Sequence, residues 1–357
     1  MNSKLFSPLK LRELIFKNRI VVSPMCQYSA VNGIPNNWHL VHLGSRAVGG
    51  AALIMAEATA VSPEGRISPS DLGIWSEAQV HAFKSITEFI KNESSIPGIQ
   101  IAHAGRKAST RELAKGSGSL TANEGGWTPI APSAVRFNEQ SVLPKEMTSE
   151  DISQVCEQFA EATKNSLNAG FEVVEIHMAH GYLLNEFLSP LTNFRKDTFG
   201  GSIENRMRFP LQVAKRVREL WPQDWPVFVR ISATDWRPDG WSLDDSVQFS
   251  KKLKELGIDL IDCSSGGSVE NAKIKSGPGY QVPFSELIRE KVDIATAAVG
   301  MITEPEQADE IIKNGKADLV FLARELLRNP YWPLHAAQKL KSEIKWPKQY
   351  DRAKNLA

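Results

Sequence analysis

Short apolar runs of strand length recur along the chain, and each is followed by a segment with helical periodicity. The runs lie at residues 19–25, 51–59, 98–103, 171–178, 227–232, 258–264, 293–300 and 317–323. Most are rich in β-branched residues or alanine and are apolar on both faces, which is typical of strands in a parallel sheet that helices cover. Eight such runs predict an α/β fold, a single (β/α)8 TIM barrel that spans residues 1–357 as one domain.

Helical segments are predicted between the runs, at residues 76–92, 149–168, 202–220, 242–256, 303–314 and 330–340. The first places apolar residues at positions 80, 83, 86 and 89, behind Ser76 as a predicted N-cap. The interval 106–148 is rich in Gly, Ser and Pro and is too long for a simple connection. It follows the third strand, so we expect an extended loop at the C-terminal face of the barrel, where active sites lie.

Composition removes several classes of protein. Lys and Arg total 42 against 41 for Asp and Glu, a net charge of +1, which argues against a nucleic-acid binder. No apolar run approaches the roughly 18 to 20 residues of a membrane span. Three cysteines make no disulfide framework, and the N-terminal residues lack the apolar core of a signal peptide. We therefore expect a cytoplasmic protein. The length also fits two average domains, but we predict a single barrel because no dinucleotide-binding fingerprint occurs.

Polar side chains cluster where the fourth run ends. Alternation places His177 on the same face as Phe171 and Glu175, and His180 and Tyr182 follow on the loop. Three interpretations stay open. The two histidines could bind a metal, they could donate hydrogen bonds to a carbonyl or nitro oxygen while Tyr182 supplies a proton, or all three could be satisfied core groups.

Other strands carry residues that are unusual in a packed core. Arg230 lies inside an apolar run, so it needs either a structural salt bridge or a role as a fixed positive charge beneath an electron-accepting group. The amide of Gln100, inside another apolar run, needs hydrogen-bond partners, which a planar heterocycle would supply. Cys26 follows the first strand as a small hydrophobe, a nucleophile or a redox-tuning contact. His39 and His42 are interpreted as structural residues of the first helix.

The ends of the seventh and eighth strands indicate an anion site. Gly300 ends one, and Ala323 and Arg324 end the other. In barrels the loops after these strands commonly bind phosphate, Gly allows the backbone to approach closely, and Arg supplies charge and several donors. The alternative is an ordinary turn with a surface arginine.

Together these segments resemble the Old Yellow Enzyme family of FMN-dependent ene-reductases, in particular its thermophilic-like branch, which includes bacterial xenobiotic reductases. The resemblance extends from NRIVVSPMCQYSA through GIQIAHAGRK and EIHMAHGYLLNEFLSPLTNFRKDTFGGSIENRMRF to VFLARELLRNP. It implies FMN as cofactor and NADPH or NADH as hydride donor. It also implies ping-pong reduction of the C=C bond of α,β-unsaturated carbonyl or nitro compounds through flavin N5, with Tyr182 as proton donor.

The resemblance also implies roles for individual residues. Those expected to bind the flavin are Ser23, Pro24, Met25, Cys26, Ala58, Gln100, Arg230, Gly300, Ala323 and Arg324. Those expected to contact the substrate, a small activated alkene, are Tyr28, His177, His180, Tyr182 and Arg352, of which His177, His180 and Tyr182 are catalytic. Cys26 would tune the reduction potential, Arg230 would face the N1/O2 edge of the ring, and no metal is expected.

Arg352 resembles the C-terminal arginine finger of this branch, which reaches into the active site of a neighbouring subunit. It implies a homodimer or a homotetramer. Two rival functions remain at this point, a metal-dependent barrel hydrolase that uses His177 and His180, and a flavin-binding protein without catalysis.

Overall fold

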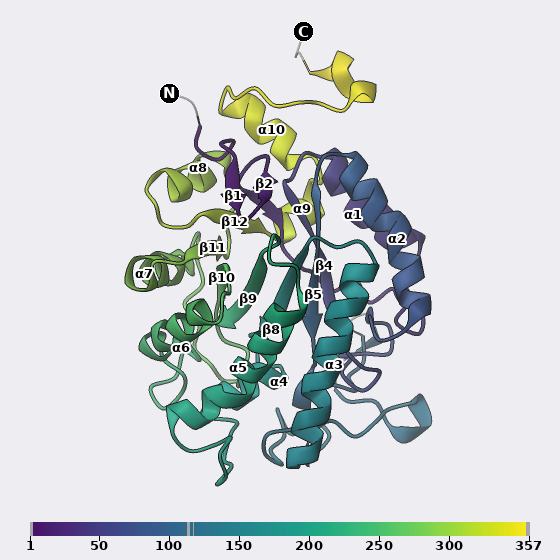
Figure 1. Cartoon of the computed structure of the whole chain (residues 1–357), viewed down its shortest axis with the longest axis vertical. Helices are drawn as coiled ribbons and strands as arrows, with labels where there is room; N and C mark the ends of the chain where they lie inside the picture. Colours follow the sequence, from purple (N-terminus) through teal and green to yellow (C-terminus); the bar gives the residue numbers. More distant parts are fainter. Residues whose placement is uncertain (1–2, 113–114, 117, 355–357) are drawn as a thin grey trace.

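Eight parallel strands close into a barrel in the computed structural model, which describes residues 3–112, 115–116 and 118–354 (Figure 1). In chain order the strands are β3 (Ile20–Val22), β4 (Leu53–Ala60), β5 (Ile96–Ala102), β8 (Val173–Met178), β9 (Val227–Ser232), β10 (Leu260–Ser264), β11 (Ala295–Val299) and β12 (Leu319–Leu322). Each pairs with the next, and β12 pairs with β3. Each predicted run overlaps one of these strands, so the predicted fold class is confirmed.

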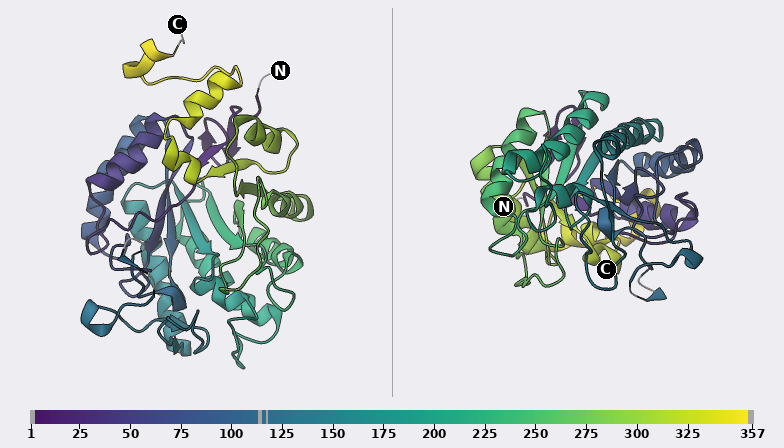
Figure 2. Two further views of the ribbon diagram at one scale, coloured as in Figure 1. Left: turned by 180° about the vertical axis from the view of Figure 1, so that it is seen from behind. Right: turned by 90° about the horizontal axis from the view of Figure 1, so that it is seen from below.

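Helices cover the outside of the barrel (Figure 2). They are α1 (Asn37–Val48), α2 (Glu77–Asn92), α3 (Ser149–Asn168), α5 (Ile203–Leu220), α6 (Leu243–Glu255), α7 (Val282–Val292), α8 (Pro305–Lys313) and α10 (Trp332–Lys339), with the shorter α4 (Leu183–Leu188) and α9 (Arg324–Arg328). All six predicted helices are present. Ser76 is the N-cap of α2, as predicted, and its N–H donates to Gln79 Oε1 at 3.0 Å. Helix α7, over Val282–Val292, was not predicted from the sequence.

A short hairpin closes one end of the barrel. Strands β1 (Leu9–Leu11) and β2 (Leu14–Phe16) pair antiparallel, and Phe16 stacks on Phe228 inside the barrel with ring centroids 6.3 Å apart. The hairpin therefore excludes water from the interior at the end where the strands begin, which leaves the opposite, C-terminal end free for chemistry.

The predicted face of Phe171 is wrong. Val173 belongs to the inner cluster of the barrel, so alternation along β8 places Glu175 and His177 inside as well. Phe171 precedes β8 and packs outward against Phe83 of α2, with centroids 5.2 Å apart in an edge-to-face arrangement. The alternation does not extend to Phe171, because this residue is not part of the strand.

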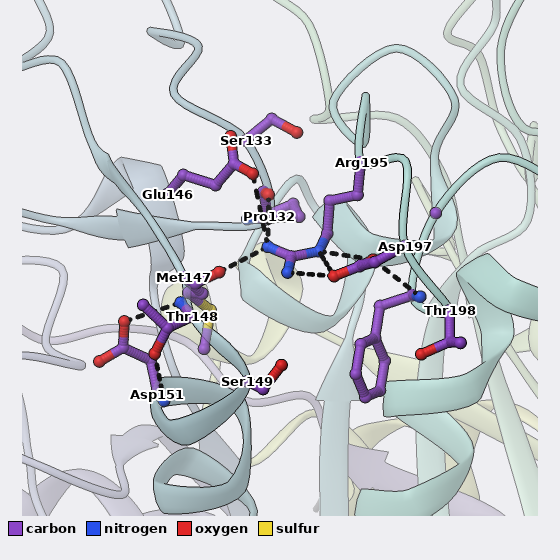
Figure 3. Close-up of polar contacts among 12 residues, drawn as sticks. Pro132, Ser133, Glu146, Met147, Thr148, Ser149, Asp151, Arg195, Asp197 and Thr198 are labelled. Atoms are coloured by element: carbon purple, nitrogen blue, oxygen red, sulfur yellow. Dashed lines mark hydrogen bonds and ion pairs between the residues drawn. The ribbon is translucent and has the colours of Figure 1, made fainter.

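The long interval after β5 is tied down by one arginine (Figure 3). Its described part includes β6 (Ile130–Ala131) and β7 (Lys145–Glu146), which pair with each other. Arg195, on the loop between α4 and α5, donates through Nη1 to the carbonyl oxygens of Pro132 at 3.1 Å and Met147 at 2.6 Å. Its other nitrogens bind Asp197, with Nη2 2.5 Å from Oδ2. The buried guanidinium of Arg195 thus connects two extended loops, and the neighbouring carboxylate of Asp197 balances its charge.

The described end of the chain lies at the end of the molecule opposite α4 (Figures 1 and 2). The 3-10 helix η4 (Lys348–Ala353) lies beyond α10, at the end of the molecule where the N-terminal residues also lie. Helix α4 and the described residues of the 106–148 interval lie toward the other end in both side views (Figures 1 and 2). None of the described helices combines the length and the apolar character needed to cross a membrane.

Candidate active site

Three aromatic side chains converge where β8 ends. The ring centroid of His177 lies 5.1 Å from that of His180 and 5.0 Å from that of Tyr182, edge to face in both cases. The chain reverses sharply between them, since His180 and Gly181 have φ values of 62° and 71°. A side chain at Gly181 would collide with the backbone of Gly267. Glycine is therefore required for the turn that brings Tyr182 back beside His177.

Hydrogen bonds from three other elements fix the position of His180. Its Nε2 lies 2.7 Å from Ser264 Oγ at the end of β10, and its backbone N–H donates to Ser232 Oγ at the end of β9 at 2.8 Å. Lys107 Nζ donates to the carbonyl oxygens of His180 at 2.7 Å and Gly267 at 2.5 Å. Lys107 and Ser264 were not predicted from the sequence. The available signal was their place a few residues after, or at the end of, a predicted strand.

Burial keeps the three rings uncharged. It lowers the pKa of both histidines well below the usual 6.5, and the nearby Arg230 lowers these values further. Each imidazole of His177 and His180 is therefore neutral at physiological pH and carries one N–H donor. Burial likewise raises the pKa of Tyr182 well above 10, and Cys26 adds to this effect. The phenol consequently keeps its proton, as a general acid must before it acts.

Arg230 projects from β9 into the barrel, in register with His177 of β8, and is 6% exposed. Its Nε lies 3.0 Å from Asp262 Oδ2, and its Nη1 donates to Ser23 Oγ at 3.3 Å. Gln100 donates through Nε2 to Glu175 Oε1 at 2.8 Å. Arg230 thus has the acidic partner that a structural salt bridge requires, and it also lines the cavity described next.

A cavity of about 320 Å³ opens at the C-terminal ends of β11 and β12. Gly300 has φ +116°, and a Cβ there would lie 2.9 Å from Gln281 Nε2 and from Tyr280 Cε1, so a larger residue would not fit. Arg324 and Arg328 both border this cavity, and of the two only Arg324 was predicted from the sequence. The residues that line this cavity include Arg230, Ser264, Tyr280, Gln281, Gly300, Ala323, Arg324 and Arg328.

The donors of this cavity fit a ligand of the FMN type. Two guanidinium groups, those of Arg324 and Arg328, border the cavity, the latter paired with Glu325 at 2.5 Å, and Gly300 allows close backbone approach, a set of donors that suits a phosphate. At the inner end, Arg230 supplies a fixed charge. Gln100, buried on β5, holds the neighbouring Glu175.

The segment after β3 forms a further wall of the site. Cys26 and Tyr28 are half-buried, and burial is the main cause that raises the pKa of both. Cys26 raises the pKa of Tyr28 further, whereas a hydrogen bond with Tyr28 lowers that of Cys26 without cancelling the rise. A thiol with a raised pKa stays protonated, which argues against the nucleophile interpretation of Cys26. The backbone N–H of Gln27 between them donates to Glu57 Oε2 at 2.9 Å, which fixes this segment against β4.

The remaining expected flavin contacts lie on the same side of the barrel. Ala58 on β4 is paired in register with Gln100 and lines a small cavity together with Tyr182. Pro24 and Met25 are half-buried directly after Ser23, and Met25 packs partly against the core between strands and helices.

Arg352 does not join the site of its own chain. It is exposed in η4, at the end of the molecule opposite α4 (Figures 1 and 2). Of the five residues that follow it, only residues 353 and 354 are described. A role in the site of a neighbouring subunit therefore stays a prediction.

His39 and His42 lie on α1, as expected, and are buried. His39 Nδ1 accepts the N–H of Asn36 at 3.1 Å and so completes the helix cap, a structural role. Elsewhere in the described ranges, no three His, Cys, Asp or Glu side chains are placed to hold a metal together.

Comparisons with known proteins agree over nearly the whole chain. Residues 4–343 match the model of the NADH:flavin oxidoreductase / NADH oxidase family. The NADPH dehydrogenase of Geobacillus sp. (strain WCH70) is 51% identical over 354 residues, 99% of each chain. The NADPH dehydrogenase of Bacillus subtilis (strain 168) is 48% identical over the same length and coverage.

Solved structures give the same picture. Morphinone reductase superposes with a TM-score of 0.80 at 26% identity, covering 98% of this chain and 92% of its own. An Old Yellow Enzyme homologue from Zymomonas mobilis superposes with a TM-score of 0.80 at 26% identity, covering 96% of this chain and 94% of its own.

Proposed function

The chain belongs to the NADH:flavin oxidoreductase / NADH oxidase family, and from this premise we propose that it is an ene-reductase. As an oxidoreductase of the Old Yellow Enzyme type it uses FMN and takes its hydride from NAD(P)H. We propose that its acceptors are the C=C bonds of α,β-unsaturated carbonyl and nitro compounds. Family membership decides against a metal-dependent hydrolase, and the activity of the curated relatives decides against a flavin-binding protein without catalysis.

One observation carries the proposal. The rings of His177, His180 and Tyr182 meet beside the cavity that Arg230 lines, all three uncharged and each with a hydrogen to donate. Two neutral N–H donors with an adjacent protonated phenol suit an acceptor that gains negative charge on oxygen and a proton on carbon.

FMN, when bound, supplies the ring that accepts a hydride from NAD(P)H and passes one to the second substrate. We propose that Gly300, Ala323 and Arg324 hold its phosphate and that Gln100 and Arg230 contact its ring. The ring contacts would be completed by Ser23, Pro24, Met25, Cys26 and Ala58. The continuity of the cavity from Arg324 to Arg230 supports this division.

The protein side chains then act on the second substrate. We propose that His177 and His180 donate to its carbonyl or nitro oxygen, each worth about 10²–10³ in rate. Tyr182 gives its proton to the α-carbon, worth about 10²–10⁴. Tyr28 supplies a further contact, which its place beside Cys26 supports. The two substrates use the site in turn, in a ping-pong cycle.

The position of hydrogen in the product tests the proposal. Turnover of an enone in D2O with unlabelled NADPH should place one deuterium at the α-carbon and none at the β-carbon. Turnover in H2O with NADPH deuterated at the transferred position should give the reverse pattern, read by NMR of the product. An enone that comes back hydrolysed or unchanged contradicts the proposal.

Assembly and location belong to the same proposal. We infer a homodimer or homotetramer in which Arg352 completes a neighbouring site, because Arg352 is exposed and lies far from its own. We also infer a single FMN-binding domain over residues 1–357 and a cytoplasmic location. All three cysteines are free thiols, which supports the latter.

A further inference from the structure

Four buried polar side chains, one from each of four neighbouring strands, form a layer inside the barrel next to His177, which lies in register with Arg230. Gln100, Glu175, Arg230 and Asp262 come from the consecutive strands β5, β8, β9 and β10. Gln100 lies opposite Glu175 in register, and Arg230 lies opposite Asp262. Both carboxyl groups are fully buried, and Gln100 and Arg230 are 2% and 6% exposed. The mechanism proposed above uses Gln100 and Arg230 and leaves the two acids without a role.

Charges in this layer do not balance if both acids are ionised. Arg230 is the one cation of the four, and two carboxylates face it. Asp262 Oδ2 lies 3.0 Å from Arg230 Nε, but the N–H is not directed at it. Glu175 Oε1 accepts from Gln100, whereas Oε2 receives no hydrogen bond from any residue that the structure describes. A second buried carboxylate without its own cation would be costly.

The groups around the pair favour a proton on Glu175. Burial raises the pKa of both acids, the Asp262 charge raises that of Glu175 further, and Arg230 lowers both values. Asp262 has the guanidinium within 3.0 Å, while the hydrogen-bond partner of Glu175 is a neutral amide. A protonated Glu175 beside an ionised Asp262 leaves the layer with one negative charge against one positive charge.

We propose that Glu175 and Asp262 hold a single proton between them, and that the one remaining negative charge offsets Arg230 and lowers the reduction potential of bound FMN. The two acids are positioning residues, since they act on the cofactor through Arg230. Without a neighbouring negative charge, the guanidinium of Arg230 would stabilise the electron-rich reduced cofactor. Hydride transfer to the second substrate would then be less favourable. The inference rests on the proposed function only in placing FMN above Arg230.

Midpoint potentials of three purified holoenzymes test this, measured by anaerobic reductive titration against a reference dye. Glu175→Gln replaces a group that is already neutral, so we expect the parent potential. The double variant Glu175→Gln/Asp262→Asn removes the one negative charge. We expect the equilibrium to shift toward reduced FMN by at least about tenfold, which is about 30 mV upward for a two-electron couple.

Asp259→Asn serves as the matched control. Asp259 precedes β10 and pairs with Arg12 at 2.6 Å and Arg218 at 3.4 Å, near the opposite end of the barrel. Asp259→Asn removes the same negative charge from an ion pair with arginine, but we expect it to leave the midpoint potential of FMN unchanged. The inference is overturned if Glu175→Gln raises the potential as much as the double variant does, or if the double variant matches the parent.

A second readout covers a double variant that fails to fold. The infrared difference spectrum between the parent and Glu175→Gln holoenzymes at neutral pH should contain the C=O stretch of one buried protonated carboxyl group, since other buried acids such as Glu57 and Glu186, whose pKa values are also raised, contribute equally to both spectra. A difference spectrum without this band overturns the inference. A parent protein that binds no FMN would instead contradict the assigned cofactor, so the two failures are distinguishable.

Discussion

Replacing Tyr182 by Phe should slow the reduction of carbon–carbon double bonds and leave the other half of the catalytic cycle intact. The phenol lies beside the histidine pair, 5.0 Å from His177 between ring centroids, and it keeps its proton. General-acid assistance is worth about 10²–10⁴ in rate, equivalent to about 3–5 kcal/mol in the activation barrier. We therefore expect Tyr182→Phe to lose two to four orders of magnitude with an enone.

The structure indicates that this loss would be chemical. Phe keeps the edge-to-face contact with His177, and the Tyr182 hydroxyl makes no hydrogen bond to a protein group within the described ranges, so no buried partner is left unsatisfied. The free energy of unfolding should change by less than about 0.5 kcal/mol.

Stopped-flow single turnover separates the two half-reactions. Reduction of the variant by NADPH should proceed at the parent rate. Reoxidation by a quinone should also be unchanged, because quinone oxygens take their protons from water, whereas reoxidation by an enone should be slow. Parent-like reoxidation by the enone would refute the acid assignment, and equal losses with quinone and enone would indicate a defect in binding.

Further predictions concern the cofactor, the histidines and the loops. Arg324→Ala should weaken FMN binding about 10–100-fold and leave riboflavin, which lacks the phosphate, unaffected, as isothermal titration of the apoprotein would show. Because burial holds the pKa of His177 and His180 well below 6.5, the Kd of a non-reducible carbonyl ligand should stay flat between about pH 5.5 and 8, and a break near 6.5 would contradict their neutrality. Arg195→Ala should lower the free energy of unfolding in urea by about 2–4 kcal/mol, since two carbonyl groups lose their donor. The hydrogen bonds of Arg195 also lower the pKa of Asp197. In the parent, the free energy that this ion pair contributes should therefore be fully present above about pH 4 and be lost as the pH falls through the lowered pKa of Asp197, whereas Arg195→Ala should lack this pH dependence.

The barrel was predictable because its strands are buried on both faces. Continuous apolar runs mark such strands directly, and all eight runs overlap a barrel strand. The hairpin Leu9–Leu11 and Leu14–Phe16 left no such signal, since strands of three residues are too short to show a period. Phe171 was assigned to the wrong face because alternation was extended beyond the strand.

Part of the candidate site was also readable. His177, His180 and Tyr182 lie within six residues, so local sequence is enough to bring them together. Lys107 and Ser264 reach His180 only when the barrel closes.

Acidic residues inside apolar strands are a signal that the sequence did contain. Glu175 and Asp262 each interrupt a predicted strand, as Arg230 does. Reading the three together would have required knowing that β8, β9 and β10 are neighbours in the sheet, which the order of a (β/α)8 barrel does imply.

The absorption spectrum of the purified protein under anaerobic conditions tests the central claim most directly. We predict a flavin spectrum that bleaches on addition of one equivalent of NADPH and returns fully on addition of one equivalent of an enone, with the saturated ketone as product. A protein that bleaches with NADPH but stays bleached when the enone is added would contradict ene-reductase activity.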